Sequence, residues 1–294
     1  MNEEKINFKN KYKGLLLDIE GVIYEGNKLI EGSIETINKL LANGFKIKYL
    51  TNTTTTSRRL IFKKLLQFKL PLNESDIFSP AIATNIFLKK KNISRISLFT
   101  NQFLQEDFTD FVIDDIKPEA IILRDLFKEF NWEKLNKVFQ TILENNALII
   151  AIALHKNRYC KRENKLSLDL GPFVAALEYA TSKKSVLIGK PEKNFFNLAI
   201  EEMKLKNEEV VMIGDDIVAD IGGAKNICLS TIQVKTGKFQ KKDATNVYLN
   251  QIIELIQFQS YLTFWVWNKL TMFKIVKFSK YIKKIVYQKN KCTN

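Results

Sequence analysis

Histidine and cysteine are scarce in this chain, which has one histidine and three cysteines among its 294 residues. The cysteines, Cys160, Cys228 and Cys292, lie far apart and form no CxxC pair, so we expect reduced thiols rather than a zinc site or a disulfide. A Ser-His-Asp triad would have to be built around His155 alone. The first residues, MNEEKINFKNKYK, contain no apolar stretch, so we expect no secretory signal or spanning helix there, and a cytoplasmic protein.

Acidic residues are absent after Glu254, and this absence accounts for much of the net charge of +14. Eight lysines of this segment supply eight of the fourteen charges: Lys269, Lys274, Lys277, Lys280, Lys283, Lys284, Lys289 and Lys291. A drift of composition toward lysine can explain the remaining excess without a partner, so we expect no specific nucleic-acid partner. The hydrophobic share of 46% and the charged share of 27% are typical of a soluble globular protein.

Four short apolar runs each predict a buried strand that stops at polar or small residues. They are LLLD at Leu15–Asp18, KIKYLTN at Lys46–Asn52, VLIGK at Val186–Lys190 and VVMIGDD at Val210–Asp216. Runs of this length, separated by helical patterns, predict one parallel sheet in an α/β fold. The helical patterns begin at Ser33, which we expect to cap its helix, at Ser57, and at Pro191 in a first-turn position.

The segment between the second and third runs has strand-like patterns of its own. They are ISLF at Ile96–Phe99, AIIL at Ala120–Leu123 and ALIIAIAL at Ala147–Leu154, with a helical pattern from Trp132 to Leu143. An insert of about a hundred residues favours a second α/β unit over a loop. We therefore predict a Rossmann-like, doubly wound parallel-sheet core of residues 1–82 and 183–258, with a smaller α/β domain inserted at 83–182.

Polar or charged side chains end all four predicted strands: Asp18, Thr51 with Asn52, Lys190, and Asp215. Ligands of such folds bind outside the carboxyl ends of the strands, where a carboxylate can attack phosphorus and form an aspartyl-phosphate. Two converging carboxylates repel each other, and Mg²⁺ relieves this repulsion by accepting oxygen ligands from both. Each residue alone is more simply a turn, capping or surface residue, but the set of four favours phosphoryl transfer.

The same motifs carry a family resemblance. DIEGVIYEG, YLTNTTTTS, IGKPEKNFF and VMIGDDIVADIGGA resemble the four motifs of the haloacid dehalogenase superfamily of phosphohydrolases. Their order and the position of the insert are similar to subfamily IIA, whose members carry an α/β cap at that place. The resemblance covers roughly residues 12–257. It implies a Mg²⁺-dependent phosphatase of a small phosphorylated compound, with pyrophosphate or a phosphoamide as candidate substrates.

The resemblance also implies roles for single acidic residues. Asp18 would be the nucleophile and a Mg²⁺ ligand, the backbone carbonyl of Glu20 a second ligand, and Asp215 the third. Asp216 and Asp220 would lie around the metal, where direct ligation and a supporting or capping role stay equally open. The chain departs from the family at Glu20, where most of its phosphatases have the Asp that serves as general acid and base. Glutamate keeps the carboxyl group that acts as general acid and base, but its side chain is one methylene longer than that of Asp. The position of the carboxyl group therefore decides whether it can protonate the leaving group.

The remaining candidate residues concern the substrate. The resemblance implies that Thr51, Asn52 and Lys190 bind the phosphate group, and that Lys190 also stabilises the charge of the reacting groups. His155 of the insert is a candidate for contact with the rest of the substrate, and a satisfied or surface histidine is equally open. The insert would act as a lid, and caps of this subfamily often mediate dimers, so a homodimer is one expectation.

Beyond about residue 258 the resemblance ends, and lysines alternate with aromatic residues through 259–294. This extension can lie on an anionic membrane surface, stack on single-stranded nucleic acid, or have no role.

The predicted phosphatase activity has an alternative of a different class, a catalytically weakened scaffold that binds a phosphorylated ligand or protein. Intact Asp18, Lys190 and Asp215 favour the enzyme, whereas Glu20 alone favours the scaffold.

Overall fold

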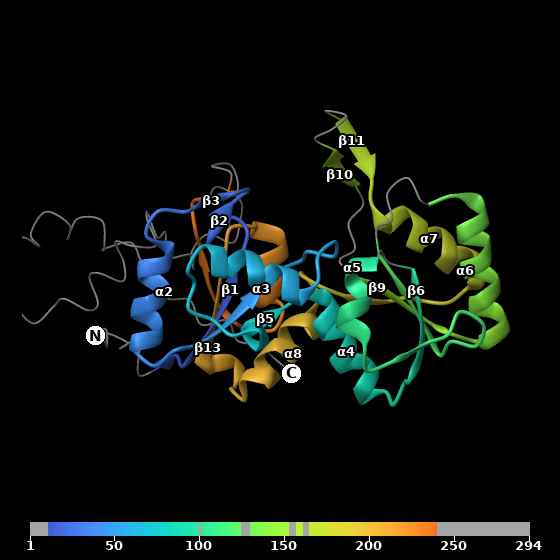
Figure 1. Cartoon of the computed structure of the whole chain (residues 1–294), viewed down its shortest axis with the longest axis horizontal. Helices are drawn as coiled ribbons and strands as arrows, with labels where there is room; N and C mark the ends of the chain where they lie inside the picture. The colour runs from blue at the N-terminus through green and yellow to red at the C-terminus, as the bar shows by residue number, and fades with distance from the viewer. Residues whose placement is uncertain (1–10, 100–101, 125–129, 153–156, 161–164, 240–294) are drawn as a thin grey trace, which may run out of the picture. The chain divides into compact units, whose positions relative to one another are not determined.

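The computed structural model describes residues 11–99, 102–124, 130–152, 157–160 and 165–239 (Figure 1). The chain separates into a first unit, residues 1–50, 65–76 and 199–294, and a second unit, residues 51–64 and 77–198. His155 and the extension 259–294 lie outside the described residues. Over the ranges that are described, no helix is both long and apolar enough to cross a membrane.

The first unit contains four parallel strands in the order β14-β13-β1-β4. Their bounds are Gly14–Asp18 for β1, Lys46–Leu50 for β4, Val210–Gly214 for β13 and Ser230–Gln233 for β14. Every residue of β1 and β13 is buried, as expected for strands with neighbours on both sides. Leu17 pairs with Ile213, so the carboxyl ends of β1 and β13 lie side by side at one edge of the sheet.

Shorter elements complete the first unit. They are the antiparallel pair β2 (Tyr24–Glu25) and β3 (Lys28–Leu29), helix α2 (Ser33–Ala42), the 3-10 turns η1 (Glu74–Asp76) and η4 (Asn207–Glu209), the π-helical turn η5 (Ile217–Gly222) and α9 (Gly223–Lys225). Two further helices have residues in both units: α3 (Arg58–Gln67) and α8 (Lys193–Met203). All the predicted helices exist, and their exact beginnings differ from the prediction at two places.

The predicted cap Ser33 is the first residue of α2, and Gly32 is the N-cap. Gly32 has φ +77, a left-handed conformation that glycine adopts at little cost, and the Ser33 hydroxyl instead donates to the Ile23 carbonyl at 3.2 Å. Pro191 lies in a turn, and α8 begins at Lys193. Cys228 is disulfide-bonded, so the expectation of a reduced thiol is wrong at that position.

The second unit is an α/β unit of its own, as predicted for the insert. Its parallel sheet has the order β12-β9-β8-β6-β7. The strands of this sheet are β6 (Arg95–Phe99), β7 (Val112–Ile113), β8 (Ala120–Leu123), β9 (Leu148–Ile152) and β12 (Val186–Ile188). The unit also contains the short β5 (Ile77–Phe78), which is not part of this sheet, and the separate antiparallel pair β10 (Asn157–Cys160) and β11 (Lys165–Leu168). The helices are α4 (Pro80–Lys90), α5 (Gln102–Gln105) with the 3-10 turn η2 (Glu106–Phe108), α6 (Trp132–Asn145) and α7 (Leu170–Thr181).

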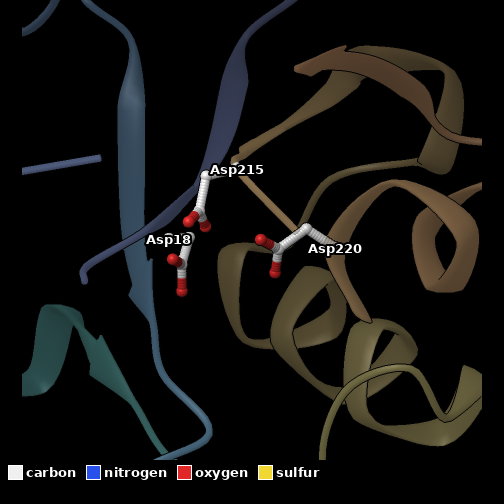
Figure 2. Close-up of side chains that lie close together, drawn as sticks. All are labelled: Asp18, Asp215 and Asp220. Carbon is white, nitrogen blue, oxygen red and sulfur yellow. The ribbon is translucent and has the colours of Figure 1, made fainter. Parts of the chain in front are cut away.

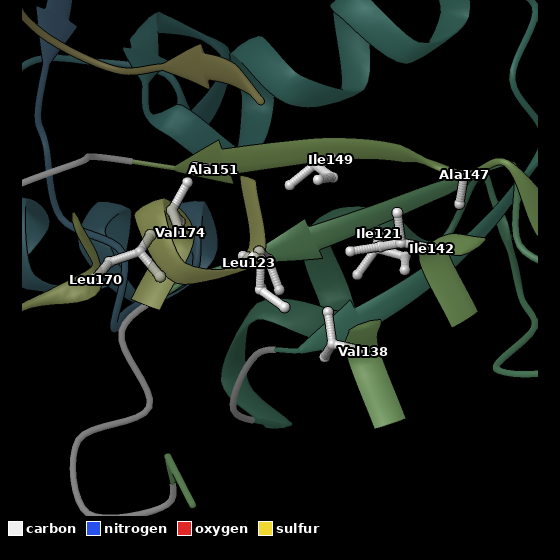
Figure 3. Packing of buried hydrophobic residues seen from close by; sticks show 10 residues of the cluster. Ile121, Leu123, Val138, Ile142, Ala147, Ile149, Ala151, Leu170 and Val174 are labelled. Atoms are coloured by element: carbon white, nitrogen blue, oxygen red, sulfur yellow. The ribbon is translucent and has the colours of Figure 1, made fainter. Parts of the chain in front are cut away.

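A buried apolar cluster holds this second sheet to α6 and α7 (Figure 3). Ile121 and Leu123 of β8 and Ile149 of β9 meet Ile142 of α6 and Val174 of α7, and the exposed fraction of each side chain is 2% or less. Burying one such side chain contributes about 1.5–3 kcal/mol to folding, so the cluster fixes the sheet that carries the loops at its carboxyl edge.

The prediction that VLIGK lies in the same sheet as the other three runs is wrong. Strand β12 pairs with β9 of the second sheet, with Val186 opposite Ile150 and Ile188 opposite Ile152. A short apolar run such as VLIGK predicts that a strand is buried, but it does not predict which strand lies next to it. The predicted domain boundaries also differ from the two units, because residues 51–64, 77–82 and 183–198 cluster with the insert. The boundaries stay a prediction about folding domains.

Candidate active site

Three buried aspartates converge at the carboxyl edge of the first sheet (Figure 2). Asp18 ends β1, Asp215 follows β13, and Asp220 lies in η5. One carboxylate oxygen from each side chain lies within 4.8 Å of the other two. Their exposed fractions are 6% for Asp18, 2% for Asp215 and 0% for Asp220. The parallel pairing of β1 with β13 brings the first two together, as the sequence predicts.

Asp215 is held between two glycines. The Lys238 amide donates to its Oδ2 at 2.6 Å. A Cβ atom on Gly21 would lie 2.2 Å from the same oxygen, and one on Gly237 would lie 2.1 Å from it. Real Cβ atoms do not approach so closely, and both glycines also have positive φ, 92° and 57°. These glycines let the backbone close around the carboxylate.

The electrostatics of the cluster suit a hard cation. Burial raises the pKa of Asp215, the Lys238 amide opposes that rise, and the negative charge of Asp220 adds to it. Buried carboxylates this close are costly when all are ionised, and a divalent cation with oxygen ligands removes that cost. The donor set of three carboxylates is the kind that Mg²⁺ prefers, so the residues present fit a magnesium ion.

The neighbouring acidic residues divide into two roles. Asp216 caps η5, because its Oδ1 accepts hydrogen bonds from the amides of Val218 at 3.0 Å and Ala219 at 2.9 Å. Burial alone would raise the pKa of Asp216, but these amides and the Lys238 ammonium hold it below its ordinary value. Asp220 instead joins the cluster while its Oδ2 accepts from the Asp216 amide at 3.2 Å. Of the two, only Asp220 belongs to the cluster of three carboxylates that could hold a metal ion.

Glu20 lies on the turn just after Asp18 and is exposed. The turn is closed by Gly21, whose amide donates to the Tyr24 carbonyl at 2.8 Å. Burial raises the pKa of Tyr24 to about 12, and the charges of Glu20 and then Asp18 add to that rise. The phenol of Tyr24 therefore lies within electrostatic reach of both carboxylates, and it stays neutral at physiological pH.

The predicted phosphate-binding residues lie in the second unit, where Asn52 and Lys190 are joined by a reciprocal pair of hydrogen bonds. The Asn52 amide nitrogen donates to the Lys190 carbonyl at 2.8 Å, and the Lys190 backbone amide donates to Asn52 Oδ1 at 2.8 Å. The Thr51 hydroxyl accepts from the Thr53 amide at 3.0 Å. Thr51 and Lys190 are buried, with exposed fractions of 8% and 4%. These hydrogen bonds join the loop after β4 to the loop after β12, which are far apart in the sequence.

Sequence reasoning did not single out Gly237 and Lys238, whose backbone completes the surroundings of Asp215. The signal is the glycine of the run VKTGK after an apolar strand, a position that favours a turn with positive φ. No local pattern shows that this turn returns to β13. The Thr236 hydroxyl donates to the Gly21 carbonyl, which joins the turn to the Asp18 loop.

The chain is similar in sequence to two family models and to several known proteins. Residues 15–113 match the family model described as haloacid dehalogenase-like hydrolase, and residues 187–254 match a second one described as HAD-hydrolase-like. The phospholysine phosphohistidine inorganic pyrophosphate phosphatase of Xenopus laevis is 35% identical over 239 residues, which cover 80% of this chain and 87% of that protein. The rat haloacid dehalogenase-like hydrolase domain-containing protein 2 is 35% identical over 235 residues, 80% of this chain and 88% of that protein.

A solved structure supports the fold. The p-nitrophenyl phosphatase from Archaeoglobus fulgidus matches with a TM-score of 0.76 and 22% identity, over 86% of this chain and 99% of that chain. The two relatives match at 35% identity over 80% of this chain, which shows the family. The chain belongs to the haloacid dehalogenase-like hydrolase family.

Proposed function

We propose that this protein is a Mg²⁺-dependent phosphatase that acts through an aspartyl-phosphate on Asp18. The observation that carries the proposal is the buried cluster of Asp18, Asp215 and Asp220 within 4.8 Å at the end of the central strands. The cluster gathers three buried carboxylates at one point, and a divalent cation with oxygen ligands would offset the cost of burying their charges together. Membership of the family supports the same assignment.

The cation would be held by Asp18, Asp215, Asp220 and the backbone carbonyl of Glu20. When bound, it supplies positive charge that neutralises the carboxylates and polarises the phosphate group. The position of Asp215 is restricted by Gly21, Gly237 and the Lys238 amide, which lie close around its carboxylate. Asp220 would also stabilise the backbone after β13, because its carboxylate accepts a hydrogen bond from the Asp216 amide.

Asp18 would act as the nucleophile. One of its carboxylate oxygens forms a bond to phosphorus as the bond from phosphorus to the leaving atom breaks. That atom, an oxygen in pyrophosphate or a nitrogen in a phosphoamide, takes a proton from Glu20. Water then attacks the aspartyl-phosphate, Glu20 takes a proton from it, and inorganic phosphate leaves with Asp18 restored. Thr51, Asn52 and Lys190 would bind phosphate oxygens, with the Lys190 ammonium offsetting their charge.

The name of one relative supports a proposal for the substrate class. That relative is named for phospholysine, phosphohistidine and inorganic pyrophosphate, which share a phosphoryl group on a nitrogen or phosphate oxygen. We propose a small compound of this kind for the present chain, pyrophosphate or a phosphoamide. The leaving groups of these compounds need less help from a general acid than an alkyl ester does, which is compatible with glutamate at position 20.

The experiment is a phosphate-release assay over a panel of phosphorylated compounds, with Mg²⁺ or with EDTA. The wild type is compared with Asp18→Asn, and Asp216→Asn serves as the matched control because Asp216 caps η5 outside the cluster. We expect Mg²⁺-dependent release by the wild type and by Asp216→Asn, and none above background by Asp18→Asn. Full activity of Asp18→Asn would refute the proposal.

A second candidate is a binding scaffold with little or no turnover, and the exposed Glu20 is the observation in its favour. This scaffold would bind a phosphorylated ligand through Thr51, Asn52 and Lys190. Binding of inorganic phosphate by calorimetry without turnover of any compound in the panel would identify it. Liposome flotation with and without residues 259–294 tests the predicted membrane contact, and sedimentation tests the predicted homodimer.

A further inference from the structure

A buried arginine of the second unit holds the loop that follows Thr51 and Asn52. Arg124 lies just after β8, and its side chain and backbone together are only 5% exposed. Its Nη1 donates a hydrogen bond to the Thr54 carbonyl. Its own amide donates to the Phe99 carbonyl at 3.4 Å, which anchors it to the end of the neighbouring strand β6. Arg124 therefore joins the sheet of the insert to the middle of the Thr53–Thr56 loop.

Two acidic residues of η2 hold the other end of the same loop. The Ser57 hydroxyl donates to Glu106, and Arg59 Nε donates to Glu106 Oε2 at 2.8 Å. The Arg58 amide, the first of helix α3, lies 3.2 and 3.1 Å from the two carboxylate oxygens of Asp107. A carboxylate at the first turn of a helix accepts amides that have no partner within the helix.

These contacts hold the chain at Asn52, Thr54 and Ser57, within and just after the residues that would bind phosphate. Asn52 is fixed to Lys190 on one side, and Thr54 and Ser57 are fixed to the insert on the other. Residues 53–56 form no helix or strand of their own. Ordering such a loop for binding costs conformational entropy, and this cost is smaller when other residues already hold the loop in its binding conformation.

We propose that Arg124 is a positioning residue that holds residues 51–57 in the conformation that binds phosphate. Glu106 and Asp107 hold the other end of this segment through Ser57 and Arg58. The inference rests on the proposed function for its effect on substrate, and it concerns residues that the resemblance to the family did not assign. Arginine suits the position because its planar guanidinium group offers several donors in a fixed arrangement and keeps its charge when buried. Lysine offers a more flexible point charge.

The test compares Arg124→Met, which keeps the length of the side chain, with Arg124→Lys, which keeps the charge. Arg95→Met is the matched control, because Arg95 begins β6 in the same unit and contacts Lys117 and Glu119 but no residue of the loop in any described hydrogen bond or ion pair. Two quantities are measured: KM and kcat with the best substrate of the panel, and hydrogen exchange of peptides that cover residues 52–60.

We expect Arg124→Met to raise KM about tenfold, the effect of losing one charged hydrogen bond, with a smaller change in kcat. Arg124→Lys should recover part of the loss, and Arg95→Met should match the wild type. Exchange of the 52–60 peptides should become faster in Arg124→Met while exchange in β8 and β9 is unchanged. Wild-type KM and wild-type exchange in Arg124→Met would overturn the proposal.

The exchange measurement separates this inference from the proposed function. If the wild type hydrolyses nothing, but Arg124→Met still exposes residues 52–60 to exchange, the phosphatase proposal fails and the positioning of the loop stands. If Arg124→Met fails to fold, Glu106→Gln and Asp107→Asn test the same loop from its other end, where the side chains are half-buried. Exchange as slow as in the wild type in both of these variants would also overturn it.

Discussion

Replacing Asp215 by asparagine should stabilise the metal-free protein while it removes the response to Mg²⁺. The change keeps the shape of the side chain and removes one of the three negative charges in the cluster. Two unit charges 4.8 Å apart repel by about 3.5 kcal/mol at an effective dielectric constant of about 20, and Asp215 faces two such carboxylates. The metal-free site is therefore a source of instability in the wild type.

Two effects reduce the gain. Burial, together with the charge of Asp220, raises the pKa of Asp215, so proton uptake relieves part of the repulsion. Asparagine is also a weaker acceptor for the Lys238 amide, which costs about 1 kcal/mol. We expect a net increase of about 2 kcal/mol in the free energy of unfolding, or about 4–8 °C in Tm for a chain of this size.

The sign of the pH dependence is a further check. A carboxyl group whose folded pKa is raised favours the folded state while it is protonated, and that contribution is lost as pH rises from its ordinary value of 3.8 through the folded value. The advantage of Asp215→Asn over the wild type should therefore be small at the lower end of this window and grow as the pH rises.

The assay is thermal unfolding in EDTA and over a titration with Mg²⁺. A saturating ligand that binds only the folded state raises its stability by about 2.7 kcal/mol at a hundred times Kd. The wild type should show such a rise and Asp215→Asn should not. Asp216→Asn is the control: its side-chain oxygen can still accept the Val218 and Ala219 amides, so it should stay within about 1 kcal/mol of the wild type and keep the response to Mg²⁺. The reasoning is refuted if Asp215→Asn is less stable in EDTA or responds to Mg²⁺ like the wild type.

Three other variants test separate parts of the site. Gly237→Ala should lower kcat/KM at least tenfold, because its Cβ would displace Asp215, whereas Gly26→Ala, at a similar φ with open space around it, should lose only about 1 kcal/mol of stability; equal effects on activity would contradict this. Glu20→Asp should be at least as active as the wild type, and a collapse in rate would show a site built around the longer side chain. Asn52→Ala should raise the KM for substrate about tenfold through its bonds to Lys190, and an unchanged KM would count against the role of this pair.

The sequence predicted the strands and the main carboxylates because both depend on local patterns. Apolar runs of four or five residues marked β1, β4 and β13, and a parallel sheet places whatever ends its strands at one edge. Asp18 and Asp215 therefore meet as predicted. Asp220 could not be assigned between ligation and support, since the π-helical turn η5 that directs its side chain to the cluster has no clear signature in sequence.

Other parts of the site depend on partners that are distant in sequence. The pairing of β12 with β9 took VLIGK out of the first sheet, although its composition resembles that of the core strands. Arg124 directly follows the strand AIIL, and a charged residue at the end of an apolar run was its only signal in the sequence. Its contact with Thr54 spans 70 residues, and no periodicity within either segment encodes such a contact.

The central claim is that Asp18 carries the phosphoryl group during turnover. The most direct measurement is mass spectrometry of the peptide that contains LLLDIEGVIY, after rapid acid quenching of the protein with substrate and Mg²⁺. We predict a phosphorylated peptide with the modification on Asp18, absent when EDTA replaces Mg²⁺ and absent from Asp18→Asn. Turnover of the substrate with the phosphoryl group on another residue, or on none under conditions that trap acyl phosphates, would contradict the account.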